Sequence, residues 1–289
     1  EFIENIDLPF PIVGAIKVKD QVQFNPLKFI EEISKDLNIY ENTFIKKIEN
    51  SHAFTDNGEI IADKIIITTH FPFINRHGSY FLKMYQNRSY VIAIDNAPNM
   101  NGMYIDESET GMSFRNYKDL LFVGGGSHRT GKSGGNWLEL EKFIKKYYPK
   151  SSERYRWSTQ DCITLDGIPY IGNYSKNTPD LYVATGFNKW GMTSSMISAM
   201  ILSDLVLGKD NEYAEVFSPS RSILRPQLAI NAAEAIKNLM TISKKRCSHM
   251  GCALKWNKYE HSWDCPCHGS RFSEEGSIIN NPAMQNIKI

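Results

Sequence analysis

The sequence predicts a chain of mixed class, α/β plus α+β, that ends in a small antiparallel β module. Two apolar runs, 64–69 and 181–185, are typical of the buried strands of an α/β domain. Between them, residues 80–157 contain short alternating segments separated by turn residues, as an antiparallel sheet does. The segment 244–289 carries closely spaced cysteines and histidines, which indicates a small metal-binding module.

Local signals predict the elements in the first part of the chain. Asn25 followed by Pro26 predicts a helix start, with asparagine as the N-cap and proline in the first turn. Residues 42–49 and 59–69 both have strand-like composition, and Asn57-Gly58 predicts a hairpin turn between them. We therefore expect a helix followed by a hairpin.

The later elements follow from periodicity and from helix stop signals. Residues 137–148 have the apolar spacing of an amphipathic helix, which Pro149 ends. The strand 181–185 leads into a loop with two glycines and then into a helix from about 192 to 207, closed by Gly208. Antiparallel strands are expected at 89–95, 103–105, 111–115 and 120–124.

The most specific pattern in the chain is the group of cysteines and histidines between residues 247 and 268. Cys247 with His249, and Cys265 with His268, each place one thiolate and one imidazole in a short segment. A [2Fe–2S] cluster needs four terminal ligands, and two histidines can replace two cysteines on one of the irons. These four residues are therefore the candidate cluster ligands.

Two other interpretations of these residues stay open. Zinc also accepts two cysteines and two histidines, although zinc fingers usually keep the cysteines together and the histidines together. Each segment here is mixed. The second alternative is that the cysteines are ordinary buried side chains.

The segment from Cys247 to Phe272 resembles a Rieske domain, because it contains both Cys-x-His-x-Gly-Cys and Cys-Pro-Cys-His-Gly-Ser. The resemblance implies a [2Fe–2S] cluster and a role in electron transfer. It also implies that Cys252 and Cys267, one from each segment, form a disulfide that joins the two ligand loops.

Residues from about 10 to 220 resemble the FAD-dependent amine oxidoreductases related to D-amino acid oxidase, glycine oxidase and sarcosine oxidase. The shared landmarks are the segments 40–45, 65–70, 166–172 and 182–192. The resemblance is to the subset with a C-terminal Rieske domain, and it implies a two-domain flavoenzyme fold. In this family the loop after the late strand lies against the flavin ring, and backbone atoms from an earlier segment lie near the adenine. The implied FAD-binding residues are Ile45, Gly186, Phe187, Asn188, Lys189, Trp190, Gly191, Met192 and Thr193.

Two features depart from the family pattern. The family begins with a βαβ unit that bears G-x-G-x-x-G, and this fingerprint is missing from the 289 residues. Rieske domains have several strands ahead of the first ligand loop, whereas a helix expected to end near Met240 leaves only residues 241–246 there. We therefore expect a flavoenzyme fold that is incomplete at its N-terminal end.

The expected domain organisation divides the chain into consecutive parts. Residues 1–70 are expected to form part of an FAD-binding domain, with substrate-domain strands at its start, and residues 71–165 a substrate domain with an antiparallel sheet. The chain then returns to the FAD-binding domain in residues 166–210. A C-terminal helix and linker (211–243) lead to a Rieske cluster-binding domain (244–289).

A competing motif lies in the middle of the chain. Residues Gly126 to Ser133 match the P-loop pattern, which would indicate a nucleotide triphosphatase. A P-loop lysine begins a helix, however, and here Gly134 and Gly135 follow Ser133 directly, at a cost to a helix of about 2 kcal/mol. A glycine-rich connection between a strand and the next helix is the simpler interpretation.

Composition excludes several classes of function. The net charge of +1 and the lack of a basic patch do not indicate a nucleic-acid partner. No apolar run approaches 18 residues, so no transmembrane helix is expected. Four of the five cysteines belong to the cluster segment, and Cys162 is expected in the core, so the pattern favours the cytoplasm over a secreted disulfide scaffold.

The sequence thus predicts an FAD-dependent oxidoreductase that oxidises a small amine or amino acid. Its electrons would pass through the Rieske [2Fe–2S] cluster to or from a redox partner protein or a small electron carrier. The alternative is an electron-transfer protein with a vestigial flavin domain. His70, His77 and His128 are considered for the active site, but no catalytic residue is assigned.

Overall fold

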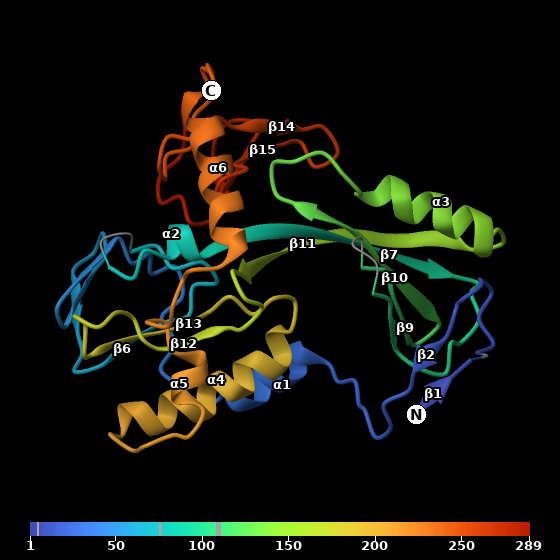
Figure 1. Ribbon diagram of the computed structural model, residues 1–289, viewed down its shortest axis with the longest axis horizontal. Helices are drawn as coiled ribbons and strands as arrows, with labels where there is room; N and C mark the ends of the chain where they lie inside the picture. The colour runs from blue at the N-terminus through green and yellow to red at the C-terminus, as the bar shows by residue number, and fades with distance from the viewer. Residues whose placement is uncertain (5, 75–76, 108–110) are drawn as a thin grey trace.

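A long antiparallel sheet runs through the middle of the molecule (Figure 1). The C-terminal module lies on one side of it, and a smaller sheet with helix α4 (Gly191–Val206) lies on the other. The computed structural model describes residues 1–4, 6–74, 77–107 and 111–289. None of the helices in these ranges is long and apolar enough to cross a membrane.

The central sheet confirms the predicted antiparallel pattern. Its strand order is β11-β7-β10-β9-β8, with each neighbouring pair antiparallel. Helix α3 (Trp137–Tyr147) packs on it through the buried Leu140, which lies in one cluster with Ile92 and Leu121. The strands are β7 (Met84–Asp95), β8 (Tyr104–Ile105), β9 (Ser113–Tyr117), β10 (Leu120–Arg129) and β11 (Ser152–Thr164).

The smaller sheet contains the predicted buried strand. Strand β13 (Leu181–Thr185) is buried along its whole length and runs parallel to β6 (Ile65–Ile67). On its other side it pairs antiparallel with β12 (Tyr170–Asn173). Helix α4 packs on this sheet through Ile201 and Leu202. The short helix α5 (Ala214–Phe217) follows.

The predicted helix near the N-terminus is confirmed. Helix α1 (Pro26–Ile33) begins where expected, because the Asn25 side chain accepts hydrogen bonds from the backbone N–H groups of Leu27 and Lys28 at 3.0 and 3.2 Å. Ahead of it, β1 (Phe2–Ile3) pairs with β2 (Ala15–Ile16).

The prediction of one hairpin from residues 42–49 and 59–69 is wrong in detail. Only β3 (Lys47–Glu49) forms from the first segment, and the turn at 57–58 connects β4 (His52–Phe54) to β5 (Glu59–Ile61). The second segment breaks after β5, and β6 joins the other sheet. The reason is burial: β5 is exposed, whereas Ile67 reaches the core beside β13.

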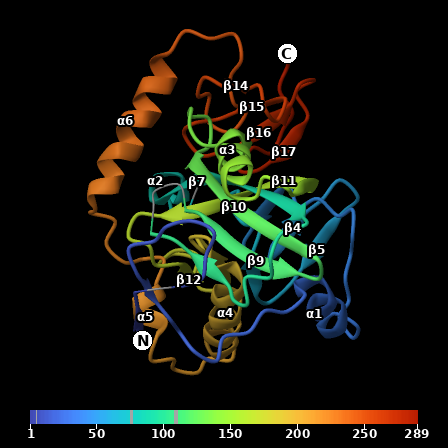
Figure 2. The same ribbon diagram turned by 90° about the vertical axis from the view of Figure 1, so that its right-hand side faces the viewer.

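The C-terminal module is an antiparallel sheet in the order β14-β15-β16-β17, preceded by helix α6 (Pro226–Met240), which ends where predicted (Figure 2). Helix α2 (Tyr80–Lys83) contacts α6. Ahead of the first ligand loop, the described residues form only an isolated bridge between Arg246 and Ala253. The module strands are β14 (Lys255–Asn257), β15 (Ser262–Asp264), β16 (Arg271–Ser273) and β17 (Ile278–Asn280).

Buried charged side chains join the C-terminal module to the central sheet. Arg88 of β7 pairs with Glu260, whose carboxylate also lies 3.1 Å from Arg271 and accepts a hydrogen bond from the Tyr90 hydroxyl at 2.9 Å. The two arginine side chains and Glu260 are at most 7 % exposed. Burial raises the pKa of Glu260, but the two guanidinium groups outweigh burial and hold the pKa below its ordinary value. The module is therefore docked through ionised groups.

Candidate metal centre and flavin loop

The two predicted ligand loops have the same backbone geometry. In the first loop Gly251 N–H donates to Cys247 O, and in the second Gly269 N–H donates to Cys265 O, both at 2.9 Å. The glycines have φ values of +77° and +81°, which other residues rarely adopt. Each loop thus curls back over its own cysteine.

These loops bring the four predicted ligands together. The rings of His249 and His268 lie 5.0 Å apart and nearly perpendicular, and the thiols of Cys247 and Cys265 are buried and share a hydrogen bond. That bond lowers the pKa of Cys247 to about 7 and raises that of Cys265. Backbone N–H groups of each loop also donate to its cysteine sulfur, which favours the thiolate form that binds metal.

The histidines are also suited to metal binding. Burial lowers the pKa of His249 to about 4 and that of His268 to about 3, so both rings are neutral at pH 7, the form that binds metal. Nδ1 of His268 is buried and has no hydrogen-bond partner among the described residues. The Phe81 backbone acts in the opposite sense on the pKa of His268 and raises it. A buried ring nitrogen without a partner, beside a second neutral imidazole and two cysteines, suits a metal ligand, so the residues fit a cluster.

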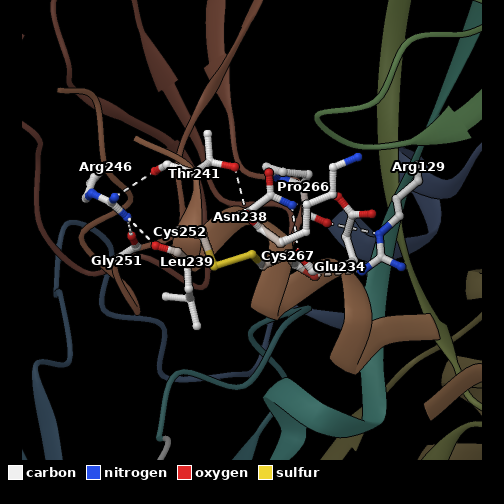
Figure 3. The surroundings of a disulfide bond; sticks show 11 residues. Arg129, Glu234, Asn238, Leu239, Thr241, Arg246, Gly251, Cys252, Pro266 and Cys267 are labelled. Carbon is white, nitrogen blue, oxygen red and sulfur yellow. Dashed lines mark hydrogen bonds between the residues drawn. A yellow bond between two sulfur atoms is a disulfide. The ribbon is translucent and has the colours of Figure 1, made fainter. Parts of the chain in front are cut away.

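Cys252 and Cys267 form a disulfide between the two loops, as the resemblance implies (Figure 3). Their sulfur atoms lie within 4.8 Å of the Cys265 sulfur. This closeness alone would suggest a three-cysteine metal site. Because disulfide sulfurs are not thiolates, Cys252 and Cys267 are not available as ligands.

Removing the disulfide should make the cluster labile. A crosslink that closes a loop of this length, with a sequence separation of 15, contributes about 3 kcal/mol in the chain-entropy account. We expect the variant with both Cys252→Ser and Cys267→Ser to assemble the cluster but to lose its visible absorbance several-fold faster on heating or with chelator. Equal half-lives in variant and parent would show that the disulfide does not stabilise the loops.

The predicted flavin loop is a tight connection between β13 and α4. Gly186 has φ +73°, and a Cβ there would lie 2.3 Å from the Thr164 side chain. The Asn188 side chain accepts a hydrogen bond from Thr164 N–H at 2.9 Å, and Asn188 N–H donates to Cys162 O at 3.1 Å. The loop is thus held against the end of β11, and Cys162 lies in the core as expected.

A cavity of about 550 Å³ lies beside this loop. It is at the carboxyl ends of the parallel strands β6 and β13, where α/β sheets generally bind ligands. Of the predicted FAD-binding residues, Gly186 and Phe187 line it, together with His70, Thr185 and one face of α4. Asn188 to Thr193 and Ile45 are not among its lining residues, and Ile45 lies in an irregular segment before β3.

Polar groups gather next to the loop, on the central sheet. Lys189 Nζ donates to Ser127 Oγ at 2.7 Å, and Ser127 Oγ lies 3.1 Å from Ser89 Oγ. Burial raises the pKa of Asp161, and burial lowers that of His70, with Asp161 acting in the opposite sense. Because burial disfavours charge at both groups, His70 and Asp161 are candidates for accepting or donating a proton. His128 instead stacks on Tyr90, at 5.6 Å between ring centroids.

The P-loop alternative does not fit the structure. Gly126 to Arg129 are part of strand β10, and helix α3 begins only at Trp137. Lys132 pairs with Glu234 of α6. The N-terminus of α3 therefore does not complete a phosphate cradle at this lysine.

The sequence interpretation missed the side chains that hold the second ligand loop. Gln86 Nε2 donates to the carbonyl of His268 at 2.8 Å, and Gln160 Nε2 donates to that of Gly269 at 2.9 Å. Both glutamines are buried and come from β7 and β11, far from the loop in sequence. In the sequence, each glutamine is simply an uncharged polar residue within a strand pattern. Residues of this kind usually face solvent, so the pattern gives no sign that these two are buried.

Comparisons with known proteins agree with this geometry. Residues 3–205 match the family described as FAD dependent oxidoreductase, and residues 206–289 match the Rieske [2Fe-2S] domain. The protein YhfW of Bacillus subtilis (strain 168), named for a Rieske 2Fe-2S iron-sulfur centre, is 35% identical over 345 residues, which cover 98% of this chain and 67% of the relative. Since 345 exceeds the chain's 289 residues, the relative has additional residues within the matched region.

Two further matches cover one part of the chain each. The cytochrome b6-f complex iron-sulfur subunit 3 of Nostoc sp. (strain PCC 7120 / SAG 25.82 / UTEX 2576) is 44% identical over 43 residues, which cover 15% of this chain and 24% of that protein. The structure of glycine oxidase from Geobacillus kaustophilus matches with a TM-score of 0.55 and 21% identity, over 64% of this chain and 53% of that one. The chain thus spans about half of the glycine oxidase, which shares its fold. On the family matches, this chain belongs to the FAD-dependent oxidoreductases and carries a C-terminal Rieske [2Fe–2S] domain.

Proposed function

We propose that the protein oxidises a small amine or amino acid and that its electrons leave through the Rieske cluster to a redox partner. FAD would accept hydride from the substrate, and the cluster would carry single electrons. Gly186 to Thr193 would bind the flavin ring. Cys247, His249, Cys265 and His268 would hold the cluster.

One observation carries this proposal: consecutive residues touch both sites. His70 lines the cavity beside the flavin loop. The next residue is Phe71, and the centroid of its ring lies 6.4 Å from the centroid of the His268 ring. Phe71 is fully buried, and its carbonyl accepts a hydrogen bond from the Asn281 side chain of the C-terminal module at 2.8 Å. An electron would therefore cross little more than one packed side chain between the cavity wall and a cluster ligand.

The polar groups beside the loop support an amine or amino-acid substrate. The Lys189 ammonium is positioned by Ser127 and can pair with a carboxylate. Asp161 and His70 can accept or hold the proton of a substrate ammonium, so that the neutral amine reacts. The direct test is anaerobic addition of glycine, D-alanine, L-proline or a simple primary amine to the purified chain. Bleaching of the flavin absorbance by one of these compounds is the expected result, and an unbleached flavin with all of them would contradict this substrate class.

Replacing Gly191 with valine should remove the flavin without unfolding the protein. Outside its chain neighbours and the nearby backbone of α4, no described residue lies within 4 Å of a Cβ at Gly191, so the side chain meets free space in the protein itself. In the proposed site the flavin would occupy that space. We expect Gly191→Val to keep the thermal midpoint and the cluster but to lose most bound flavin, with Gly191→Ala intermediate. Normal flavin content in the valine variant would contradict the assignment of this loop.

The alternative is an electron-transfer protein whose flavin domain is vestigial. The two functions differ in flavin stoichiometry. Nearly one flavin per chain in purified protein supports the enzyme. A full complement of iron without flavin, also after incubation with FAD, would favour the alternative.

A further inference from the structure

The glycine-rich segment that resembles a P-loop contacts the second ligand loop. Gly131 has φ +74°, and a Cβ there would lie 2.6 Å from the backbone nitrogen of Pro266. Thr130 Oγ1 donates at 2.9 Å to Gln160, the side chain that also binds Gly269 O. The glycine thus lets the end of β10 approach the loop between Cys265 and Ser270 directly. The segment is an internal docking site.

Arg129 is the charged residue of this docking site. Its Nε donates to Pro266 O and its Nη2 to Cys267 O, both at 3.0 Å, while Nη1 donates to Asn231 Oδ1 at 2.9 Å (Figure 3 shows Arg129 beside Pro266). Its guanidinium carbon also lies 4.7 Å from the centroid of the Tyr85 ring. The planar guanidinium is therefore fixed on the backbone that connects Cys265 to Cys267.

The positive charge of Arg129 is not cancelled by direct contact. In the described part of the chain its hydrogen-bond partners are neutral oxygen atoms, and the nearby carboxylate of Glu234 pairs with Lys132 instead. Burial lowers the pKa of Arg129, and Glu234, Tyr85 and Cys265 act against that, so the guanidinium and the Cys265 sulfur interact electrostatically. Arginine nevertheless stays charged in proteins.

We propose that Arg129 is a positioning residue that holds the second ligand loop on the sheet and raises the reduction potential of the cluster. The inference rests on the proposed cluster site. Reduction adds one negative charge to the cluster. A half-buried cation held against the carbonyls of Pro266 and Cys267 stabilises the reduced state more than the oxidised state, because the surrounding protein screens charge less than water does.

The test compares midpoint potentials, measured by redox titration followed by electron paramagnetic resonance. Arg129→Gln should lower the midpoint by at least about 59 mV, which is a tenfold change in the one-electron equilibrium. Arg129→Lys keeps the charge and should recover at least half of that shift. Arg246→Gln is the matched control: Arg246 also donates to a ligand-loop carbonyl, that of Gly251 at 2.7 Å, but it is exposed, so its removal should shift the midpoint far less.

A second variant covers the case in which Arg129→Gln does not retain the cluster. Asn231→Asp has nearly the same shape and places a carboxylate on the guanidinium without removing its contacts to the loop. Its midpoint should also fall. An unchanged midpoint in Arg129→Gln would overturn the proposal. If Arg129→Gln holds no cluster, an unchanged midpoint in Asn231→Asp would overturn it. An equally large fall of the midpoint in Arg246→Gln would also overturn it. A parent protein without any cluster signal would instead refute the metal centre itself.

Discussion

Replacing Cys265 with serine should abolish the [2Fe–2S] cluster. Cys265 is fully buried between the two loops, and its sulfur shares a hydrogen bond with Cys247. A serine hydroxyl is a far poorer ligand for iron than a thiolate, because the soft sulfur donor is what iron–sulfur sites select. We expect iron content and visible absorbance near zero in Cys265→Ser, with flavin content unchanged.

The matched control is Cys162→Ser. Cys162 is equally buried, but its thiol donates to the His70 carbonyl and lies outside the cluster loops. This variant should retain its iron. A Cys265→Ser protein with normal iron, or equal loss of iron in both variants, would contradict the ligand assignment. One zinc per chain and no iron in the parent protein would favour the zinc alternative.

Replacing Arg88 with methionine should cost about 3–5 kcal/mol of stability. The change removes one partner of a buried ion pair and leaves the Glu260 carboxylate with less compensation in a buried interface. Arg271 still contacts Glu260, so the loss should fall towards the lower end. Urea unfolding, followed by cluster absorbance, measures it. The double variant Arg88→Met with Glu260→Gln should recover part of the loss, because it removes the carboxylate that has lost its Arg88 partner.

Acid should weaken the same interface in the parent protein. The folded-state pKa of Glu260 lies below its ordinary value of 4.5, so the stability that its ionised form contributes is present above pH 4.5. It is lost as the pH falls through the lower, folded-state pKa. Glu260→Gln should reduce this acid dependence. Two results together would show that the Arg88–Glu260 pair does not stabilise the interface. The double variant would be no more stable than Arg88→Met, and the stability of Glu260→Gln would depend on pH as that of the parent does.

The sequence allowed the main elements and the cluster loops to be predicted because both depend on local patterns. A buried β-branched strand, an Asn-Pro helix start and mixed Cys/His segments each act over a few residues, and β13, α1 and the two ligand loops follow them. The resemblance to Rieske domains also implied the pairing of Cys252 with Cys267, which the structure contains.

The remaining features depend on contacts between distant segments. Residues 59–69 have one continuous strand pattern, but the choice between two sheets is made by β4 and by β13, which the pattern does not contain. Gln86 and Arg129 carry no local signal for their role, because the loop that they hold follows more than 130 residues later. A P-loop pattern at 126–133 likewise depends on the helix that should follow it, and that helix begins too late.

The proposed function is the transfer of electrons from a flavin site to a Rieske cluster within one chain. Its most direct test is to bleach the flavin of the purified chain anaerobically with an amino acid that it accepts, and to record the electron paramagnetic resonance spectrum at successive times. A rhombic signal of the reduced cluster, with an average g value below 2, should grow as the flavin bleaches. A flavin that bleaches fully while the cluster stays oxidised and silent would contradict it.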